Sequence, residues 1–138
     1  MFILTQFFFV LNLGMPKPTT KSTINTWSED AIQMYVTTQA LRDGYLFHGD
    51  QNAGQRRNGA KCKLMGMRKG WPDMCFVLDG RIVYIELKTY IGKLSKEQVE
   101  LHERMRSLGC EVWVVFAKDG TEAWGIIKGI LDGNKERP

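Results

Sequence analysis

The sequence predicts a small α/β domain in which helices cover a mixed central sheet. Three observations lead to this fold class. Apolar residues recur at helical spacing in several segments of the chain. Short runs rich in valine, isoleucine and aromatic residues lie between those segments and are typical of strands. The turn signal Asp79-Gly80 joins two such runs and predicts a hairpin, so the expected order is helix, strand, strand, strand, helix, strand, helix.

The first helix is expected to begin after Ser28, a favourable N-cap residue, and to end at Asp43-Gly44. Its buried face is indicated by apolar residues at helical spacing, namely Ile32, Val36 and Ala40. A short strand is predicted over Tyr45–Phe47. The glycine-rich segment that follows this strand is predicted to be a basic loop.

The rest of the domain is predicted to alternate strands and helices. The hairpin strands are expected over Asp73–Leu78 and Arg81–Lys88, on either side of the turn. A second helix is expected to open at Leu94-Ser95 and to run to Leu108, where a glycine follows. The valine-rich run Glu111–Ala117 predicts a further strand, and a last helix is expected over about Thr121–Leu131.

The composition is that of one globular domain. The chain has 138 residues, of which 43% are hydrophobic and 25% charged, and this excludes a disordered, collagen-like or coiled-coil protein. A chain of this length buries a sizeable core without disulfides or structural metal. Its 3 cysteines form no C-x-x-C pair, which argues against a disulfide scaffold and a four-cysteine zinc site. The cysteine usage predicts a reducing, cytoplasmic compartment.

The chain divides into a body and two ends. The expected boundaries are an apolar segment and linker over residues 1–26, a domain over residues 27–131 and a polar tail over residues 132–138. The apolar run at residues 1–14 is too short to span a bilayer as a helix, which needs about 20 residues. Three interpretations of this run stay open: Met15 is the true start, the run covers an apolar patch, or it anchors the chain at a membrane interface.

Basic charge is concentrated in the middle of the chain. The formal net charge is +4, and the stretch between residues 56 and 69 contains cations with no acidic residue among them. These cations are Arg56, Arg57, Lys61, Lys63, Arg68 and Lys69. Such a segment is suited to contact a phosphate backbone. The alternative interpretation is a solvated loop whose charge only keeps the chain soluble.

The hairpin register is expected to bring acidic residues together. With Asp79-Gly80 as the central turn residues, Asp73 lies opposite Glu86, and their Cβ atoms are expected about 5 Å apart. Lys88 lies two residues beyond Glu86 and therefore projects from the same face. Two carboxylates at this spacing suit a hard divalent ion such as Mg²⁺. The alternative is a two-sided strand with Glu86 and Lys88 at its surface, although the apolar run Ile82–Ile85 indicates burial on both faces.

Three motifs of this chain resemble one nuclease family. Pro72-Asp73 followed by Glu86-Leu87-Lys88 spells the PD…E-x-K signature of the PD-(D/E)xK superfamily. With Gly70-Trp71 before it and Gly92-Lys93-Leu94-Ser95-x-x-Gln98 after it, the pattern is similar to the VRR-NUC (virus-type replication-repair nuclease) domain, over Trp27–Leu131. The resemblance implies a restriction-endonuclease-like core and a stand-alone, phage-encoded member that acts in the cytoplasm of the host cell.

The resemblance also implies a role for each motif residue. Asp73 and Glu86 would be ligands of Mg²⁺ or Mn²⁺, with the backbone carbonyl of Leu87 as a third ligand. Lys88 would orient or activate the attacking water. Glu29, on the first helix, would supply a further metal ligand, although a glutamate in a first helical turn also suits the helix macrodipole.

Gln98 matches the glutamine that follows the active-site strand in this family, and the resemblance implies a catalytic role for it. Ser95-x-x-Gln98 is also a capping box, so helix initiation alone would explain both residues. The two histidines, His48 and His102, fit no base or ligand arrangement. His102 is expected to be a packing or surface residue.

The implied activity is metal-dependent hydrolysis of DNA phosphodiester bonds. The stand-alone relatives resemble Holliday-junction resolvases, which implies a structure-selective endonuclease that acts on branched DNA as a homodimer. The basic segment would hold the phosphate backbone beside the site. Two alternatives stay open: a nicking or restriction-like nuclease on duplex or flap DNA, and a nucleic-acid-binding module without activity. No membrane partner is expected.

Overall fold

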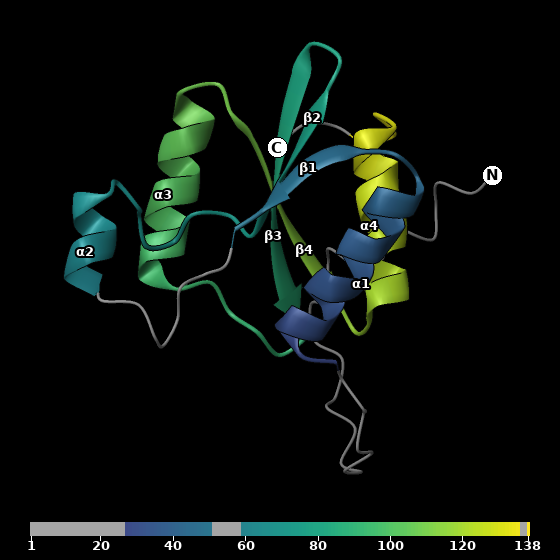
Figure 1. Cartoon of the computed structure of the whole chain (residues 1–138), viewed down its shortest axis with the longest axis horizontal. Helices are drawn as coiled ribbons and strands as arrows, with labels where there is room; N and C mark the ends of the chain where they lie inside the picture. The colour runs from purple at the N-terminus through teal and green to yellow at the C-terminus, as the bar shows by residue number, and fades with distance from the viewer. Residues whose placement is uncertain (1–26, 51–58, 136–137) are drawn as a thin grey trace, which may run out of the picture.

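The computed structural model describes residues 27–50, 59–135 and 138, which form a mixed sheet with helices on both faces (Figure 1). The strands lie across the sheet in chain order: β1 (Leu46–Gly49), β2 (Met74–Leu78), β3 (Arg81–Thr89) and β4 (Glu111–Ala117). β1 and β3 both run antiparallel to β2, whereas β4 runs parallel to β3. The predicted fold class, an α/β domain with a mixed sheet flanked by helices, is confirmed.

The helices are divided between the two faces of the sheet. α1 (Glu29–Arg42) and α4 (Gly120–Leu131) pack against each other and cover one face. α3 (Lys96–Ser107) covers the other face and forms the crossover that the parallel pair β3 and β4 requires (Figure 1). α2 (Gly59–Leu64) is a short helix on the same side as α3. Among the residues that the structure describes, no helix is long and apolar enough to cross a membrane.

The hairpin of β2 and β3 has the predicted register. Leu78 pairs with Arg81 beside the turn, and Met74 pairs with Ile85 at the far end of the ladder. Gly80 has a φ angle of +64°, the left-handed conformation that a two-residue type I′ turn needs and that glycine adopts without strain. The turn therefore determines which side chains of the two strands face each other.

Two local predictions are wrong. The segment predicted to be a basic loop contains the helix α2, because residues 60–64 include alanine, lysine and leucine, which favour helix. The first strand is Leu46–Gly49 rather than Tyr45–Phe47, because pairing with β2 sets its ends more strongly than its own residue types do. Arg56 and Arg57, from the same basic segment, lie outside the described residues.

The hydrophobic core lies between the sheet and the helix pair α1 and α4. The sheet contributes Phe76, Val83, Ile85 and Leu87, and the helices contribute Ile32, Val36, Ile127 and Ile130. Because successive side chains of a strand point to opposite faces, the residues of β3 between these core positions lie on the α3 side. Glu86 and Lys88 therefore point away from the main core, and yet both are buried.

Candidate active site

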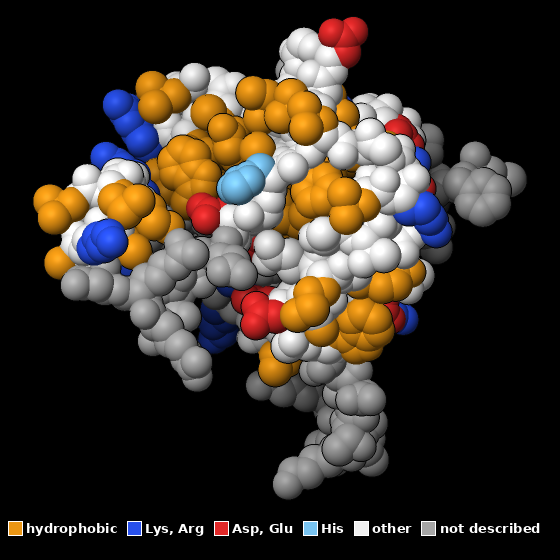
Figure 2. Space-filling view, in the orientation of Figure 1, with side chains coloured by type: hydrophobic (Ala, Val, Ile, Leu, Met, Phe, Trp, Pro, Cys, Tyr) orange, Lys and Arg blue, Asp and Glu red, His pale blue; other side chains and the backbone are white. Residues whose placement is uncertain are grey.

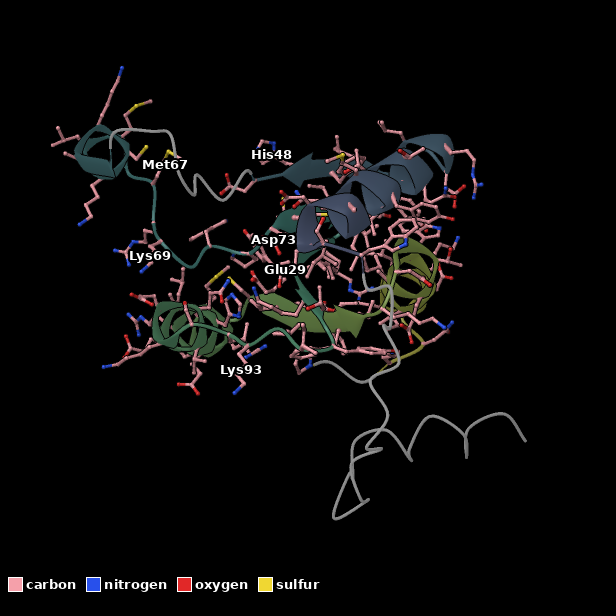
Figure 3. All side chains as sticks on the ribbon, turned by 90° about the horizontal axis from the view of Figure 1, so that it is seen from below. Glu29, His48, Met67, Lys69, Asp73 and Lys93 are labelled. Carbon is pink, nitrogen blue, oxygen red and sulfur yellow. The ribbon has the colours of Figure 1, made fainter. Side chains whose placement is uncertain are left out.

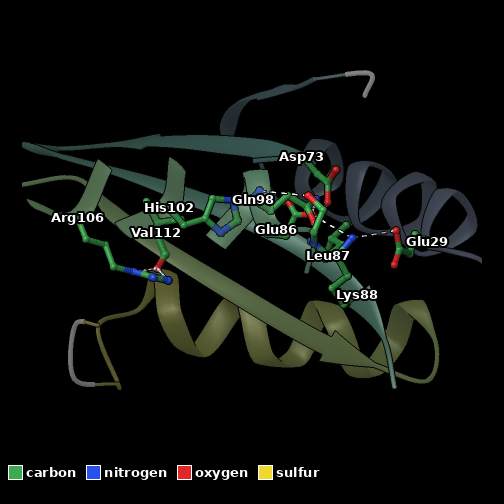
Figure 4. A network of polar contacts seen from close by, with 10 residues as sticks. Glu29, Asp73, Glu86, Leu87, Lys88, Gln98, His102, Arg106 and Val112 are labelled. Carbon is green, nitrogen blue, oxygen red and sulfur yellow. Dashed lines mark hydrogen bonds and ion pairs between the residues drawn. The ribbon is translucent and has the colours of Figure 1, made fainter. Parts of the chain in front are cut away.

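The two predicted carboxylates meet at the open end of the hairpin. Asp73 directly precedes β2, one step beyond the pair of Met74 and Ile85, and this places it opposite Glu86. Asp73 Oδ2 accepts a hydrogen bond of 2.7 Å from the backbone N–H of Leu87 (Figure 4). Asp73 is 7% exposed and Glu86 is 0% exposed. The facing arrangement expected from the turn is therefore present, and it is buried.

Lys88 lies beside Glu86 on the same side of β3. Its Nζ atom is 3.1 Å from Glu86 Oε1 and 3.3 Å from Glu29 Oε2. Glu29 comes from the first turn of α1, and its side chain is 41% exposed. A Cβ atom on Gly92 would lie 3.0 Å from Glu29 Oε1, so glycine lets the loop after β3 approach this carboxylate closely. The ammonium group thus links a buried carboxylate to one at the rim of the site.

Gln98 uses the two ends of its side-chain amide for different contacts. Ser95 is the N-cap of α3, and its Oγ atom accepts a hydrogen bond of 3.1 Å from the Gln98 N–H. The Ser95 N–H donates in return to Gln98 Oε1 at 2.8 Å, which completes the capping box. Gln98 Nε2 donates to Glu86 Oε1 (Figure 4). The two explanations that the sequence left open are therefore compatible, because the amide oxygen caps the helix and the amide nitrogen contacts the carboxylate.

His102 lies one turn after Gln98 and faces the same carboxylate. The imidazole is 1% exposed, and its Nε2 atom is 3.8 Å from Glu86 Oε2. The sequence interpretation correctly allowed a packing residue here but assigned His102 no place in the site. The spacing contained the signal, because residues four apart on a helix lie on one face. A helix that presents Gln98 to Glu86 therefore presents His102 beside it.

The segment that leads to Asp73 rests on the first turn of α3. Gly70 has a φ angle of +88°, and a Cβ atom on it would lie 2.9 Å from the backbone carbon and oxygen of Glu97. This contact leaves no room for a side chain. Glycine therefore brings the strand entry against the helical turn that also contains Gln98.

Burial raises the pKa of both carboxyl groups. The pKa of Asp73 rises to about 6, mainly because burial disfavours the charged form, although the Leu87 N–H opposes the rise. The pKa of Glu86 rises to about 7, first because of burial and then because of the charge of Asp73. Burial alone would lower the pKa of Lys88, but its hydrogen bond to Glu86 and the neighbouring negative charges raise it. The site therefore combines a persistent cation with two acids that hold protons more readily than usual.

The donor set fits a hard divalent cation. Asp73 and Glu86 stand side by side with raised pKa values, and Glu86 Oε2 is buried with no hydrogen-bond partner among the described residues. A cation beside them would favour the charged form of both groups. Within the described part of the chain, no three His, Cys, Asp or Glu side chains stand together as a metal site. The protein would thus provide two carboxylates, which is usual for Mg²⁺.

Of the basic residues expected to bind nucleic acid, those that the structure describes lie to one side of the carboxylates. Lys61 and Lys63 are on α2, and Arg68 and Lys69 follow it on the segment toward β2. Figure 3 shows Lys69 between α2 and α3 and Asp73 further along the same segment. In the space-filling view, the Lys and Arg side chains at the left lie over α2 and α3 (Figure 2).

A groove of about 420 Å³ separates this basic segment from α3. Its cationic lining residues are Lys63, Arg68, Lys69 and Arg104. Arg104 belongs to α3 and was not among the residues predicted from the sequence. Glu97 and Glu100 also line the groove, and Glu97 Oε1 is 2.8 Å from Lys69 Nζ in an exposed ion pair. The groove is therefore predominantly but not uniformly basic.

The hairpin, the crossover helix and the first helix of this α/β domain converge on Asp73, Glu86 and Lys88. The chain is similar to a solved structure described as "VRR_NUC domain protein", with a TM-score of 0.60, 22% identity and coverage of 78% of this chain and 90% of that chain. A second similar structure, "VRR_NUC domain", has a TM-score of 0.52, 25% identity and coverage of 72% and 94%. No protein-family model and no curated protein matches the sequence. The chain thus has the fold of VRR_NUC domain proteins, and the resemblance seen in its motifs is confirmed.

Proposed function

We propose that this protein is a metal-dependent endonuclease that hydrolyses DNA phosphodiester bonds. The observation that supports this best is the buried arrangement of Asp73, Glu86 and Lys88, with the ammonium nitrogen 3.1 Å from Glu86 Oε1. Their order along the chain is that of the PD…E-x-K signature, and the VRR_NUC fold implies a nuclease of the PD-(D/E)xK type. Burying ionisable side chains together costs hydration, and a structural role alone gives no reason for it.

Asp73 and Glu86 would hold the metal ion, with the backbone carbonyl of Leu87 and the carboxylate of Glu29 as further ligands. All of these donors are oxygen atoms, which Mg²⁺ and Mn²⁺ prefer. Bound there, such an ion polarises a phosphoryl oxygen and lowers the pKa of a coordinated water. Among these donors Glu86 is fully buried, whereas Glu29 lies at the rim of the site.

Lys88 and Gln98 would assist this centre in different ways. Lys88 keeps its proton because its pKa is raised, so its ammonium group can hold the attacking water and offset the charge that grows on the phosphate. Gln98 contacts Glu86 through Nε2, and the capping box holds the rest of its amide. Gln98 therefore acts on the reaction through the orientation of Glu86.

The basic residues beside the site would bind the DNA backbone. Lys61, Lys63, Arg68 and Lys69 lie on or next to α2, and we include Arg56 and Arg57 from the same segment of the sequence. Contacts from lysine and arginine to phosphate carry no sequence information, so binding should be largely sequence-independent. It should also weaken steeply as salt is added.

Branched DNA is the proposed substrate within this activity, and a homodimer is the proposed active form. Both rest on the resemblance of the motifs to stand-alone members of the family. A four-way junction presents equivalent strands in pairs, and a two-fold symmetric enzyme presents equivalent sites in pairs. A dimer would therefore place one site against each of two equivalent strands.

A cleavage assay tests the proposal. A labelled four-way junction and a linear duplex of the same sequence are incubated with the protein in Mg²⁺, Mn²⁺ or EDTA. We expect cleavage with either metal ion, none in EDTA, and faster cutting of the junction. Equal cutting of both substrates would exclude structure selectivity and favour a duplex nuclease. Binding without cleavage under every condition would indicate a binding module and contradict the proposal.

Glu86→Gln and Glu103→Gln provide a matched pair of variants. Glu86 is buried in the site, whereas Glu103 is exposed on α3 and does not line the basic groove. We expect Glu86→Gln to lower the cleavage rate by about 100-fold or more, because a metal ligand is lost. Glu103→Gln should cleave normally, and both should bind DNA in fluorescence anisotropy. Normal cleavage by Glu86→Gln would refute the assignment of this site.

A further inference from the structure

The α3 side chains Gln98 and His102 approach different oxygen atoms of Glu86. They lie one helical turn apart on the same face of α3 (Figure 4). Gln98 Nε2 donates to Glu86 Oε1, and His102 Nε2 is 3.8 Å from Glu86 Oε2. The helix therefore presents one nitrogen atom to each oxygen of the carboxylate.

The contact between His102 and Glu86 Oε2 is buried, and the atoms that face each other in it are polar. Glu86 Oε2 and both ring nitrogens of His102 are buried with no hydrogen-bond partner among the described residues. Leaving such an atom unpaired is unfavourable, because the atom gives up its hydrogen bonds to water and gains none in the protein. The Nε2 to Oε2 separation of 3.8 Å exceeds a normal hydrogen bond by about 0.9 Å. A small rotation of the ring or the carboxylate would pair two of the three atoms at once.

The acceptor capacity of Glu86 leaves room for this bond. A carboxylate offers about four lone-pair sites, two on each oxygen atom. Gln98 Nε2 and Lys88 Nζ both reach Oε1. Oε2 thus keeps one lone pair that can accept a hydrogen bond from an imidazole N–H and one that can bind a cation.

The charged group next to the ring on α3 is Arg106, one helical turn further on. The Arg106 guanidinium itself donates twice to the backbone oxygen of Val112, at 2.8 and 3.1 Å. The backbone of Gly70 is the competing acceptor for the ring: it is near enough to raise the pKa of His102, although the contact falls short of a hydrogen bond.

We propose that His102 is a positioning residue: its Nε2–H donates to Glu86 Oε2 and holds the carboxylate so that its remaining lone pair serves the cation shared with Asp73. The proposal deepens the function proposed above and rests on it. An outer hydrogen bond of this kind orients a ligating carboxylate, and its loss typically weakens metal affinity by about 10- to 100-fold. His102 itself touches neither the ion nor the DNA in this assignment.

Two substitutions distinguish the ring nitrogens. In His102→Gln the amide nitrogen stands as many bonds from Cα as Nε2 does, and in His102→Asn it stands where Nδ1 does. Calorimetric titration of each DNA-free variant with Mn²⁺ measures the metal affinity, and thermal unfolding reports whether each variant is folded. We expect His102→Gln to keep the native affinity within about threefold, and His102→Asn to lose about 10- to 100-fold. Native affinity in both variants, or retention only in His102→Asn, would overturn the proposal.

The tautomer of the native ring gives a readout that does not depend on any variant. The chain has only 2 histidines, and His48 is exposed, so ¹⁵N-detected ring spectra contain one buried and one solvated imidazole. We expect the hydrogen of His102 on Nε2. A hydrogen on Nδ1 would overturn the assignment. Failure of the native protein to cleave DNA would instead refute the proposed function, so the two failures can be told apart.

Discussion

At the scale of single residues, the site is a set of ionisable groups that the fold holds together at an energetic cost. Asp73 and Glu86 face each other and have raised pKa values, and Lys88 compensates only part of their charge. Groups with strongly shifted pKa values are concentrated at functional sites. The same groups therefore determine both the proposed chemistry and the pH dependence of stability.

Lys88 can be tested without removing either carboxylate. Lys88→Met keeps the side chain as far as the Cε position and removes the charge that lies 3.1 Å from Glu86 Oε1. We expect the single-turnover cleavage rate to fall by about 100-fold or more, because no cation then offsets the charge on the phosphate. Lys96→Met, at an exposed lysine of α3, is the control and should cleave normally. Equal rates in the two variants would exclude Lys88 from the reaction.

The metal-free protein is expected to lose stability as the pH rises toward neutrality. The pKa of Asp73 rises from 3.8 to about 6 on folding, and that of Glu86 rises from 4.5 to about 7. The folded state thus binds these two protons more tightly, so the free energy of unfolding should fall between about pH 4 and about pH 7. The lowered pKa of His102 acts in the opposite direction, but one imidazole offsets only part of two acids.

Denaturant unfolding in EDTA at about pH 5 and about pH 8 measures this difference. The control is the double variant Asp73→Asn/Glu86→Gln, in which the decrease should be absent or reversed. Mg²⁺ added at the higher pH should restore stability to the native protein and not to the double variant. A native stability that rises between these two pH values would show that the two acids are not desolvated as the structure indicates.

At the scale of secondary-structure elements, the site depends on contact between the strand entry and α3. Gly70 and Gly109 have almost the same backbone conformation, with φ angles of +88° and +89°. An alanine at position 70 would place Cβ 2.9 Å from the backbone of Glu97, whereas position 109 has nothing within 4 Å. Comparing an alanine at the two positions therefore separates the stability cost of the left-handed backbone from the cost of the clash with Glu97.

Gly70→Ala is expected to impair both stability and cleavage. Each alanine costs about 1–2 kcal/mol for the left-handed backbone alone. At position 70 the clash should add to this cost and displace Gln98 from Glu86, so cleavage should fall by about tenfold or more. Gly109→Ala should lower the melting temperature while cleavage at a permissive temperature stays normal. Normal cleavage by folded Gly70→Ala would show that the position of α3 does not control the site.

The elements also show which features are predictable from sequence. Turn chemistry at Asp79-Gly80 determines the register, and the register places Asp73 opposite Glu86, so this half of the site follows from local rules. The capping box of α3 is equally local. The contacts of His102 and Arg104 depend instead on how α3 lies over the sheet and beside α2, and this is set by tertiary packing. The helix α2 was missed because its lysines were interpreted only as charge.

At the scale of the whole molecule, the sheet separates the side of the hydrophobic core from the side of the candidate site. α1 and α4 enclose the hydrophobic core on one face, while α3, α2 and the basic groove occupy the other (Figure 1). Asp73 and Glu86 lie between these layers, beneath α3 and beside the first turn of α1. A DNA backbone held in the groove would therefore approach the carboxylates from the α2 side.

The salt dependence of DNA binding tests this division. The triple variant Lys63→Gln/Arg68→Gln/Arg104→Gln removes groove cations, and Arg42→Gln/Lys118→Gln/Lys128→Gln removes the same charge from the α1 and α4 side. Each phosphate contact contributes about 0.9 to the slope of log K against log salt concentration, so the groove variant should lose about 3 from that slope. Anisotropy titrations across a salt series measure it. Equal slopes for the two variants would show that the basic segment is only a solvated surface and does not contact the phosphates.

Fraying of the first turn of α3 is coupled to the proposed catalysis, because the side-chain amide of Gln98 takes part in both the capping box and the contact with Glu86. The first turn of α3 exists while the capping box is closed, and the same closure keeps the amide nitrogen on Glu86. Helix ends open far more easily than whole domains do. Warming should thus disconnect the amide in a growing fraction of otherwise native molecules. The proposed cleavage activity would then fall at temperatures where the overall structure still persists.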